Sequence, residues 1–404
     1  MQKIYFSTMN SVVTKNKGIL EKIEDYKHRY PVCWRCKEEL VFKLVSEWFI
    51  SSKEIKPALK REVKKVNWQP KGTGERMQDW LKNMGDWNIS RKRFWGLPLM
   101  FYVCDCGHIE IIGSLKELKE KAVDPKKVDA LPELHRPWID EIKINCPNTK
   151  CDKKVERIPE VGDCWLDAGI IPFSTLKYKK DNAYFKKWFP SEFICEMREQ
   201  IRLWYYSMLF MGITLEGKAP YKNVLSYEKV YDWKGEAMHK SAGNAIWFDD
   251  AVEKVGADVM RFMYARQNPK YNLHFGSKEK DVVQILNTFW NSRVFYRDFI
   301  TATHSKKNIL DKWILSRLNE TIKEVSENLE KFNAYKAVRK IEIFIDDLSN
   351  WYIRRSRKDI NQKVLGEVLT KLSQLMAPIV PFITEEAYKT ITKQESVHLS
   401  TWPK

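Results

Sequence analysis

The residues whose types best suit chemistry stand in the loop Lys234-Gly-Glu-Ala-Met-His-Lys-Ser-Ala-Gly-Asn244. Two glycines flank its basic centre, which consists of His239, Lys240 and Ser241. An ammonium and a hydroxyl on a flexible loop suit a triphosphate whose charge moves during a reaction, since Lys acts there as a point charge. Spacing alone favours a simpler alternative, a surface hairpin with solvated lysines. The chain contains neither a G-x4-G-K-[ST] phosphate loop nor a G-x-G-x-x-G fingerprint.

A second candidate site lies where a short apolar strand runs into a helical pattern. Glu196, Gln200 and Trp204 are spaced i, i+4 and i+8, so they share one face if the helix begins near Glu196. The carboxyl ends of strands in an open α/β sheet are where ligands bind. Glu196 would then accept ribose hydroxyls, Gln200 would bond a carboxyl or carbonyl group, and Trp204 would wall an apolar pocket. The alternative is an ordinary helix with a buried Trp.

The segment Asp163-Cys-Trp-Leu-Asp167-Ala-Gly169 is a third candidate. It places two carboxylates four residues apart with Trp165 between them, which suits the lining of a pocket. A strand edge followed by a turn explains the same spacing equally well.

Two close cysteine pairs are candidate metal ligands, Cys104 with Cys106 and Cys146 with Cys151. Two thiolate pairs can complete a tetrahedral Zn²⁺ site. Neither pair has the usual C-x2-C spacing, so the alternative is that these cysteines are small buried hydrophobes. Cys33-Trp-Arg-Cys36 has that spacing but no obvious second half. The absence of a signal-peptide pattern predicts reduced thiols and a cytoplasmic protein.

Two segments interleave cations with aromatic rings, as nucleic-acid contacts do. The first is Asp86-Trp-Asn-Ile-Ser-Arg-Lys-Arg-Phe-Trp-Gly96, in which Arg91 and Arg93 are the candidate RNA contacts; a buried amphipathic helix start is the alternative. In the second segment the candidates are Trp351, Arg354, Arg355 and Arg357. A formal net charge of +17 and a pI near 9.3 favour a polyanionic partner, nucleic acid before membrane. The alternatives are general solubility charge and cations that favour a helix C-terminus.

An α/β arrangement must position the first candidates. Glu192–Glu196 predicts a buried strand, Arg198–Ile213 a helix and Asn223–Tyr231 a second strand. Asp249 and Asp258 are predicted helix caps. Alternating strands and helices favour an α/β domain.

The C-terminal third predicts a bundle. Apolar residues step by three or four along segments 314–329, 335–352 and 365–375, and a last helix is expected near Thr384. Short polar connections favour antiparallel neighbours. We expect the boundary between the two parts from about Lys270 to Lys280. The chain has no apolar run of about 18 residues, so we expect no transmembrane helix.

Taken together, these segments resemble a class I aminoacyl-tRNA synthetase, and within that class the isoleucyl enzymes. The resemblance runs from about Tyr30 to Pro403. The motif at Asp86–Gly96 is shared by the Ile, Val and Leu enzymes, whereas Leu134-His-Arg-Pro-Trp-Ile-Asp140 and Val161–Asp167 favour isoleucine. The resemblance implies the C-terminal half of a Rossmann-like nucleotide-binding catalytic domain, followed by an α-helical anticodon-binding bundle. The domains expected are 1–32 as a remnant of the editing insertion, 33–275 as catalytic with the Cys-rich insertion, and 276–404 as the bundle.

The resemblance also implies roles for the candidate residues. Trp165 and Trp204 match positions beside the isoleucine side chain, Glu196 a contact to the adenylate ribose, and Gln200 a contact to the substrate carbonyl. Lys240 matches the second lysine of the family's mobile Lys-Met-Ser-Lys-Ser loop. The implied substrates and partners are isoleucine, ATP with Mg²⁺, and tRNA(Ile). The implied reaction forms isoleucyl-adenylate and transfers isoleucine to the tRNA.

Three departures qualify this expectation. Ala237 and His239 replace the first lysine and the first serine of the loop, and Ala168 stands where serine is common. No His-Ile-Gly-His signature occurs, so we expect either a C-terminal half that needs a separate N-terminal polypeptide or a truncated piece of a longer gene. The alternatives are a non-catalytic tRNA-binding module derived from a synthetase, and half of a valyl or leucyl enzyme.

Overall fold

The computed structural model describes residues 15–19, 22, 30–33, 36–41, 43–240, 243–276, 279–300 and 303–404. Ser241 of the predicted loop and most of segment 1–32 lie outside these residues. The chain divides into two units, Met1–Glu47 and Trp48–Lys404. No helix in the described ranges combines the length and the apolar character that crossing a membrane requires.

The first unit contains a short turn. Val32 and Glu39 form an antiparallel bridge, and the backbone N–H of Cys33 donates to the carbonyl of Glu38 at 2.7 Å. Cys33 and Cys36 both lie on this turn.

The centre of the second unit's α/β part is a three-stranded parallel sheet. Its strands, in order, are β10 (Ser191–Met197), β11 (Tyr221–Tyr227) and β2 (Asn67–Gln69). Side-chain amides run across all three, because Asn67 donates to Asn223 at 2.9 Å and Asn223 donates to the carbonyl of Glu192 at 2.7 Å. These bonds fix the register of the strands. The predicted α/β class is confirmed.

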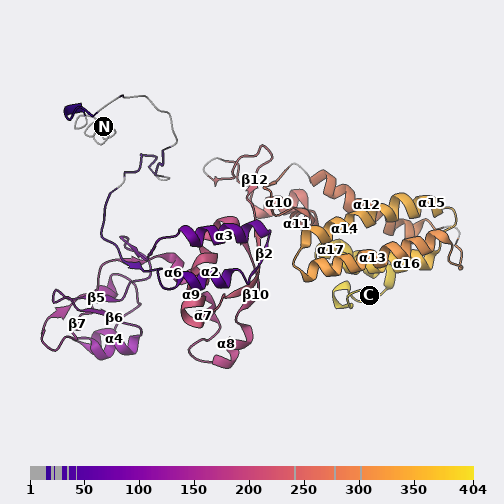
Figure 1. Ribbon diagram of the computed structural model, residues 1–404. Coiled ribbons are helices and arrows are strands. Elements are labelled where there is room, and N and C mark those ends of the chain that lie inside the picture. Colours follow the sequence, from indigo (N-terminus) through magenta and orange to yellow (C-terminus); the bar gives the residue numbers. More distant parts are fainter. Residues whose placement is uncertain are drawn as a thin grey trace. The chain divides into compact units, whose positions relative to one another are not determined.

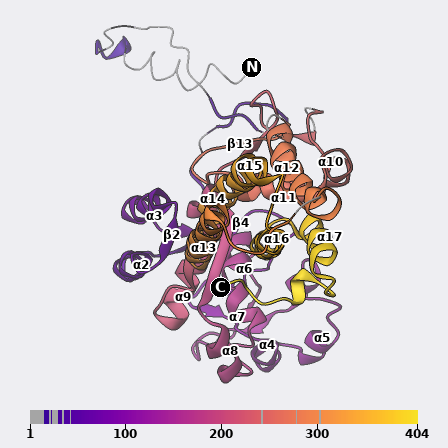
Figure 2. The same cartoon turned by 90° about the vertical axis from the view of Figure 1, so that its right-hand side faces the viewer.

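Three helices share one core with this sheet: α2 (Lys56–Val63), α3 (Lys71–Asn83) and α9 (Trp204–Glu216). Eight of the thirteen residues of α9 are buried, because this helix is apolar nearly all round. It ends at Gly217, whose φ of +68° is the left-handed conformation that glycine adopts without strain. Figure 2 shows α2 and α3 next to each other, beside β2.

The strand-to-helix junction differs from the sequence prediction. Glu196 belongs to β10, Gln200 lies in the 3₁₀ turn η2 (Arg198–Arg202), and Trp204 begins α9. The expected α-helix from Glu196 is therefore wrong, because β10 stays paired with β11 as far as Met197.

A cysteine-rich lobe contains small hairpins and short helices. Its elements are β5 (Phe101–Val103), β6 (Ile109–Ile111), α4 (Leu115–Lys121), α5 (Pro125–Asp129), η1 (Trp138–Glu141), β7 (Ile144–Asn145) and β8 (Lys154–Val155). Ser114 caps α4 by accepting a bond from the N–H of Glu117. The buried Arg157 guanidinium bonds to Asp140, which holds the end of the lobe to η1.

Short elements connect the sheet, the lobe and the bundle. They are β1 (Phe49–Ile50) with β3 (Trp87–Asn88), β4 (Ser90–Arg91) with β9 (Val161–Gly162), α6 (Cys164–Gly169), α7 (Ile171–Thr175), α8 (Asn182–Trp188), β12 (Val230–Tyr231) with β13 (Leu273–His274), α10 (Phe248–Val255) and α11 (Ala257–Arg266). Asp249 and Asp258 are not the caps of α10 and α11, because each lies inside the first turn. Asp258 instead accepts the N–H of Ile383 at 2.7 Å.

The predicted bundle is confirmed (Figure 1). Its elements are α12 (Glu279–Asp298), α13 (Ile309–Glu330), α14 (Ala334–Asp346), the π-helical turn η4 (Asp347–Ile353), α15 (Arg354–Ser356), α16 (Gln362–Met376), α17 (Pro381–Thr392) and η5 (Val397–Leu399). Asn308 and Asp311 form a capping box that starts α13. Fully buried Leu318, Ile341 and Leu372 supply one core residue each from α13, α14 and α16.

Candidate functional site

Trp165 and Trp204 lie on two helices that pack together, α6 and α9. The indole Nε1 of Trp204 donates to the carbonyl of Ala168 at 3.0 Å, and the side-chain oxygen of Gln200 accepts the Trp204 N–H at 3.0 Å. Trp165 and Trp204 are both half-buried against the same core. Gly169 allows this close packing, because a Cβ there would stand 2.8 Å from the carbonyl oxygen of Ser207.

Glu196 lies at the end of β10, beside this region. Its side chain accepts the N–H of Met197 at 3.0 Å, and its carbonyl accepts the hydroxyl of Tyr205 at 2.8 Å. The strand end therefore holds Glu196 in place without burying its carboxylate completely. A polar group at the carboxyl end of a parallel strand is placed where such sheets bind ligands.

The Asp163 carboxylate joins three segments of the chain, whereas its sequence context predicted only a residue that lines a pocket. It is 4% exposed, accepts the indole Nε1 of Trp87 at 3.0 Å and caps α6 by accepting the N–H of Trp165 at 3.3 Å. The Arg91 guanidinium pairs with the same carboxylate at 3.0 Å. The motif at 86–96 is thereby tied to the helix that carries Trp165. A cavity of about 320 Å³ opens beside these side chains, lined also by Trp80 and Arg202.

The two arginines predicted to contact RNA in this motif have different surroundings. Arg91 is half-buried and also donates to the carbonyls of Asn88 and Ser90. Arg93 is exposed next to the exposed rings of Phe94 and Trp95. Arg93 is therefore the one of the two with its side chain open to solvent.

Asp167 lies near an aromatic stack. His135 packs flat on Trp95, with ring centroids 4.5 Å apart and planes 7° apart. Burial raises the pKa of the Asp167 carboxyl, and the nearby His135 opposes that shift. Segments 86–96, 134–140 and 161–167 thus converge in space.

The loop 232–244 is closed by one buried carboxylate. Asp232, 5% exposed, accepts the N–H of Glu236 at 2.8 Å and the side-chain amide of Asn244 at 3.0 Å. These bonds, the backbone bond from Glu236 first, lower the pKa of Asp232. Asn244 also accepts the N–H of His239 at 2.9 Å, and the Lys240 ammonium lies 4.5 Å from the ring centroid of Trp247. Neither Asp232 nor Asn244 was singled out from the sequence.

The four predicted cysteine ligands form one cluster. Their sulfur atoms lie within 4.8 Å of one another, with Cys104 Sγ 3.7 Å from Cys151 Sγ and Cys106 Sγ 3.6 Å from Cys146 Sγ. A backbone hydrogen bond from His108, together with the neighbouring thiols, lowers the pKa of Cys106 to about 6, whereas burial raises that of Cys146 to about 12. A set of four thiols at this spacing fits tetrahedral Zn²⁺.

The end of the bundle exposes cations beside a ring. The Arg355 guanidinium stacks 3.8 Å from the ring centroid of Trp351, and Trp313 lies 6.1 Å from Trp351. Arg354, Arg355 and Arg357 are exposed, and no ion pair joins them to a carboxylate in the described part of the chain. The predicted RNA-contact residues of this segment therefore share one solvated end.

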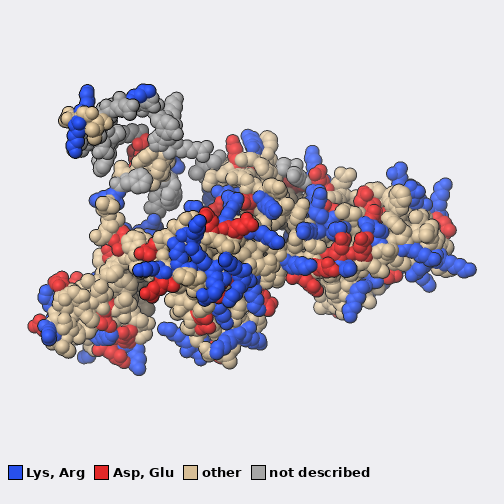
Figure 3. Space-filling model, in the orientation of Figure 1, with Lys and Arg blue, Asp and Glu red and all other residues tan. Residues whose placement is uncertain are grey.

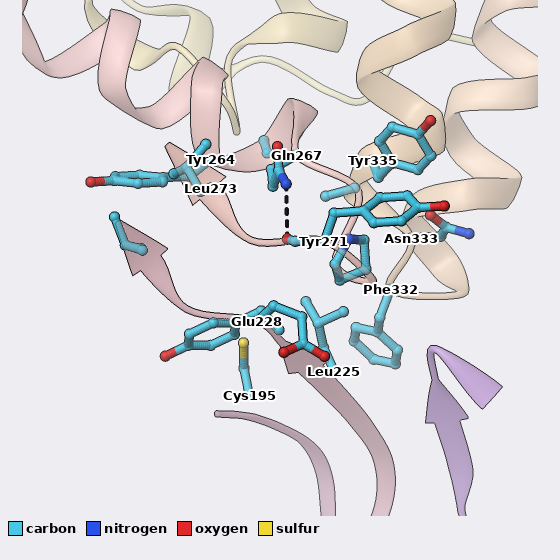
Figure 4. A pocket seen from close by; sticks show the side chains of 15 residues that line it. Cys195, Leu225, Glu228, Tyr264, Gln267, Tyr271, Leu273, Phe332, Asn333 and Tyr335 are labelled. Atoms are coloured by element: carbon cyan, nitrogen blue, oxygen red, sulfur yellow. Dashed lines mark hydrogen bonds between the residues drawn. The ribbon is translucent and has the colours of Figure 1, made fainter. Parts of the chain in front are cut away.

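A further cavity of about 440 Å³ lies between the sheet and the bundle (Figure 4). Cys195 and Leu225 line it from β10 and β11, and Phe332 lines it from the turn between α13 and α14. Phe332 stacks on Phe193 of β10, with ring centroids 4.5 Å apart. Gln267 donates to the carbonyl of Tyr271 across its rim at 2.9 Å. No sequence motif pointed to this cavity, because its walls come from four separate segments.

Comparisons with known proteins agree with this architecture. The family of tRNA synthetases class I (I, L, M and V) matches residues 10–275, and the anticodon-binding domain of tRNA ligase matches residues 311–404. The chain is 37% identical to the isoleucine–tRNA ligase of Clostridium tetani and 35% identical to that of Methanopyrus kandleri, over 96% of its own length. It spans 40% of the length of each of these relatives.

Solved structures share the fold at lower identity. The LeuRS of Agrobacterium radiobacter K84, in a ternary LeuRS–tRNA–LeuAMS complex, has a TM-score of 0.60 at 20% identity, over 79% of this chain and 43% of that one. Methionyl-tRNA synthetase of Mycobacterium tuberculosis, in complex with methionyl-adenylate, has a TM-score of 0.61 at 13% identity, over 89% of this chain and 65% of that one. With both domain families matched in order along one chain, this protein belongs to the class I tRNA synthetases of the I, L, M and V family.

Proposed function

We propose that this chain is the C-terminal part of an isoleucine–tRNA ligase, which activates isoleucine with ATP and transfers it to tRNA(Ile). The observation that carries the proposal is the identity of 35–38% to isoleucine–tRNA ligases over 96% of the chain. The placement of Trp165 on α6 and Trp204 on α9, two helices that pack together, supports an apolar amino-acid pocket. The Leu134–Asp140 segment favours isoleucine over the valyl and leucyl alternatives.

The proposed chemistry needs no covalent enzyme nucleophile. The isoleucine carboxylate attacks the α-phosphate of ATP, pyrophosphate leaves, and the terminal hydroxyl of the tRNA then attacks the adenylate. Positioning and charge stabilisation are the enzyme's contribution. Lys240 would stabilise the transferring phosphates with its loop neighbours His239 and Ser241. Mg²⁺ bound to the phosphates would supply further positive charge.

The remaining candidates would hold the substrates. Glu196 would accept the ribose hydroxyls and Gln200 would hold the carbonyl of the amino acid. Trp165 and Trp204 would wall its side chain, with Asp167 at the mouth. Lys240 must leave the face of the Trp247 ring to reach a phosphate, which suits a mobile loop.

We propose that an N-terminal polypeptide completes the sheet. In the described residues, β10 pairs on one side only, and none of its seven residues is fully buried. Parallel strands are normally covered on both faces, so an open edge of this kind favours a further strand.

The remaining parts fit accessory roles. Arg93, Trp351, Arg354, Arg355 and Arg357, with a smaller part for Arg91, would contact the tRNA. Cys104, Cys106, Cys146 and Cys151 would hold a structural Zn²⁺. We also propose a cytoplasmic location, where these thiols stay reduced.

A second candidate function is a non-catalytic tRNA-binding module. It is favoured by Ala237 and His239 in the loop, which remove one lysine and one hydroxyl from the family's pattern. Retention of Glu196, Gln200 and Lys240 favours the catalytic proposal instead.

Isoleucine-dependent ATP–pyrophosphate exchange separates the two functions. The chain is assayed alone and with a separately expressed N-terminal half of a related synthetase. Exchange in the mixture, slowed strongly by Lys240→Ala with tRNA affinity unchanged, supports the proposal. Silence in both assays while tRNA still binds would favour the non-catalytic module.

A further inference from the structure

The segment 176–188 presents a second surface with cations and rings, remote in sequence from both predicted RNA contacts. It contains five lysines and one aspartate. We call it the α8 surface and define it by exposed side chains of the segment: Lys177, Lys179, Lys180, Tyr184, Lys186, Lys187 and Trp188. Figure 3 shows Lys and Arg side chains around this part of the molecule.

Two rings of the α8 surface lie open to solvent. Tyr184 is 39% exposed and Trp188 is 52% exposed, and their centroids are 6.4 Å apart. The ammonium of Lys177 lies 4.9 Å from the Tyr184 ring centroid, and that of Lys187 lies 5.2 Å from the Trp188 ring centroid. Such pairs carry positive charge directly beside a stacking face.

The rings are held outward by packing on the other side of α8. Phe185 is fully buried against Phe173 and Phe189, so the helix cannot turn Tyr184 and Trp188 inward. The apolar side of the helix is therefore already used, and the exposed rings are a separate feature.

The lysines of the α8 surface are not neutralised. Asp181 is the only carboxylate of the segment, and its side chain caps α8 by accepting the N–H of Tyr184 at 3.0 Å. In the described part of the chain no ion pair joins any of the five lysines to a carboxylate. The segment therefore carries five lysines without an ion pair to any described residue, and two of them, Lys177 and Lys187, lie over the two rings.

We propose that the α8 surface binds single-stranded RNA, with Tyr184 and Trp188 stacking bases and the lysines contacting phosphates. Exposed rings interleaved with cations are what sequence-tolerant single-strand binding uses, since every base has a face to stack and every nucleotide carries a phosphate. This contact goes beyond the proposed ligase function, because it would hold RNA whether or not the chain activates isoleucine.

An anionic membrane is the competing partner for a Trp- and Lys-rich surface. Interfacial helices bury a continuous apolar face in the lipid. Here Phe185 has already buried that face within the protein, and α8 is only seven residues long. The observations therefore favour RNA.

The test measures binding of a fluorescein-labelled dodecamer of uridylate by anisotropy, with the full chain, from 25 to 200 mM KCl. We expect Tyr184→Ala/Trp188→Ala to weaken binding by about tenfold or more, since each stacked base contributes substantially. Trp188→Phe keeps a ring and should keep most of the affinity. Lys186→Ala/Lys187→Ala should lower the salt slope by about 1.4, at about 0.7 per phosphate contact on a single strand.

Matched variants separate this site from others. Lys126→Ala/Lys127→Ala removes two exposed lysines of α5, neither of which lies over a ring in the described residues, and should change the slope less. Arg354→Ala/Arg355→Ala reports binding at the bundle. A 4-thiouridine oligonucleotide should crosslink to the peptide that contains residues 181–190. The proposal would be overturned if Tyr184→Ala/Trp188→Ala and Lys186→Ala/Lys187→Ala both bind RNA within twofold of wild type. It would also be overturned if Trp188 is needed for binding to phosphatidylserine vesicles but not for binding RNA. Pyrophosphate exchange with the N-terminal half should not respond to the α8 variants.

Discussion

The indole of Trp204 is bonded to the backbone of Ala168, with Nε1 3.0 Å from the carbonyl oxygen. This bond joins the first residue of α9 to α6, the helix that carries Trp165. Gly169, the next residue, lets α6 approach the backbone of Ser207. The geometry of the proposed amino-acid pocket therefore depends on glycine at position 169, which has no side chain.

Replacing Gly169 with Ala should separate the two helices. The new methyl would stand 2.8 Å from the carbonyl oxygen of Ser207, and backbone cannot yield as a flexible side chain does. We expect a loss of about 1–3 kcal/mol in the free energy of unfolding, measured by urea denaturation. Gly72→Ala is the matched control, because it lies in α3 with open space around it and should stabilise by about 0.5–1 kcal/mol. Equal effects of the two substitutions would contradict this account.

Replacing Asp163 with Asn should weaken the link between Trp87 and α6. The carboxylate accepts from Trp87, Arg91 and the N–H of Trp165, and an amide cannot accept all three. We expect a loss of about 1–3 kcal/mol in unfolding free energy. Asp129→Asn, which removes the exposed ion pair with Lys119, should cost less than about 1 kcal/mol. If Asp163→Asn lowers the unfolding free energy no more than this control does, Asp163 does not stabilise the link between Trp87, Arg91 and α6.

Zinc should be present at one ion per chain. Metal analysis of protein purified without chelator tests this directly, and Cys106→Ser should lower the zinc content because serine is a poor zinc ligand. Cys164→Ser is the control, since that cysteine is exposed and lies outside the cluster. Chelator treatment of the wild-type chain should make the cysteine-rich lobe more sensitive to protease. A purified chain without zinc that also takes up none would refute the site.

Stability of the bundle should depend on pH through His304 and Asp311. A hydrogen bond to Asp311, 2.9 Å long, raises the pKa of His304. Burial by itself would raise the pKa of Asp311, but bonds from Tyr352 and His304 lower it overall. The His contribution is complete below about pH 6.5 and is lost as pH rises through its folded pKa, whereas the Asp contribution is complete above about pH 4 and is lost on acidification. Unfolding free energy should therefore fall above about pH 6.5, and His304→Gln should flatten that limb. If unfolding free energy falls above about pH 6.5 equally in His304→Gln and in the wild-type chain, another titratable group causes that fall.

The bundle and the cysteine cluster could both be predicted from the sequence, the first by a regular pattern and the second by residue type. Apolar steps of three and four residues fix the buried stripe of each helix, so Leu318, Ile341 and Leu372 could be expected in the core. Thiol chemistry singled out the four cysteines even though their spacing is irregular. Ser114 was predictable as a cap, because its side chain bonds to a residue three positions away.

Interactions between distant segments could not be predicted in the same way. Asp163 reaches Trp87 across 76 residues, and no local pattern encodes that pair. Asp258 serves α17 rather than its own helix for the same reason. The helix expected from Glu196 was wrong because pairing with β11 outweighs the helical spacing of the side chains. The roles of Glu196, Gln200 and Lys240 stay predictions.

The π-helical turn η4 sets the helical phase of the cationic end of the bundle. In a π-helix each N–H bonds to the carbonyl five residues back, so the wider turn rotates every following residue relative to an α-helical continuation of α14. Tyr352 can then face inward to Asp311 while Arg354 and Arg355 face solvent. The direction in which the arginines point is consequently set by the number of residues in 347–353 more than by any one side chain. Deleting one residue from 347–353 would turn Arg354 and Arg355 in another direction, whereas most point substitutions in this segment would leave their direction unchanged.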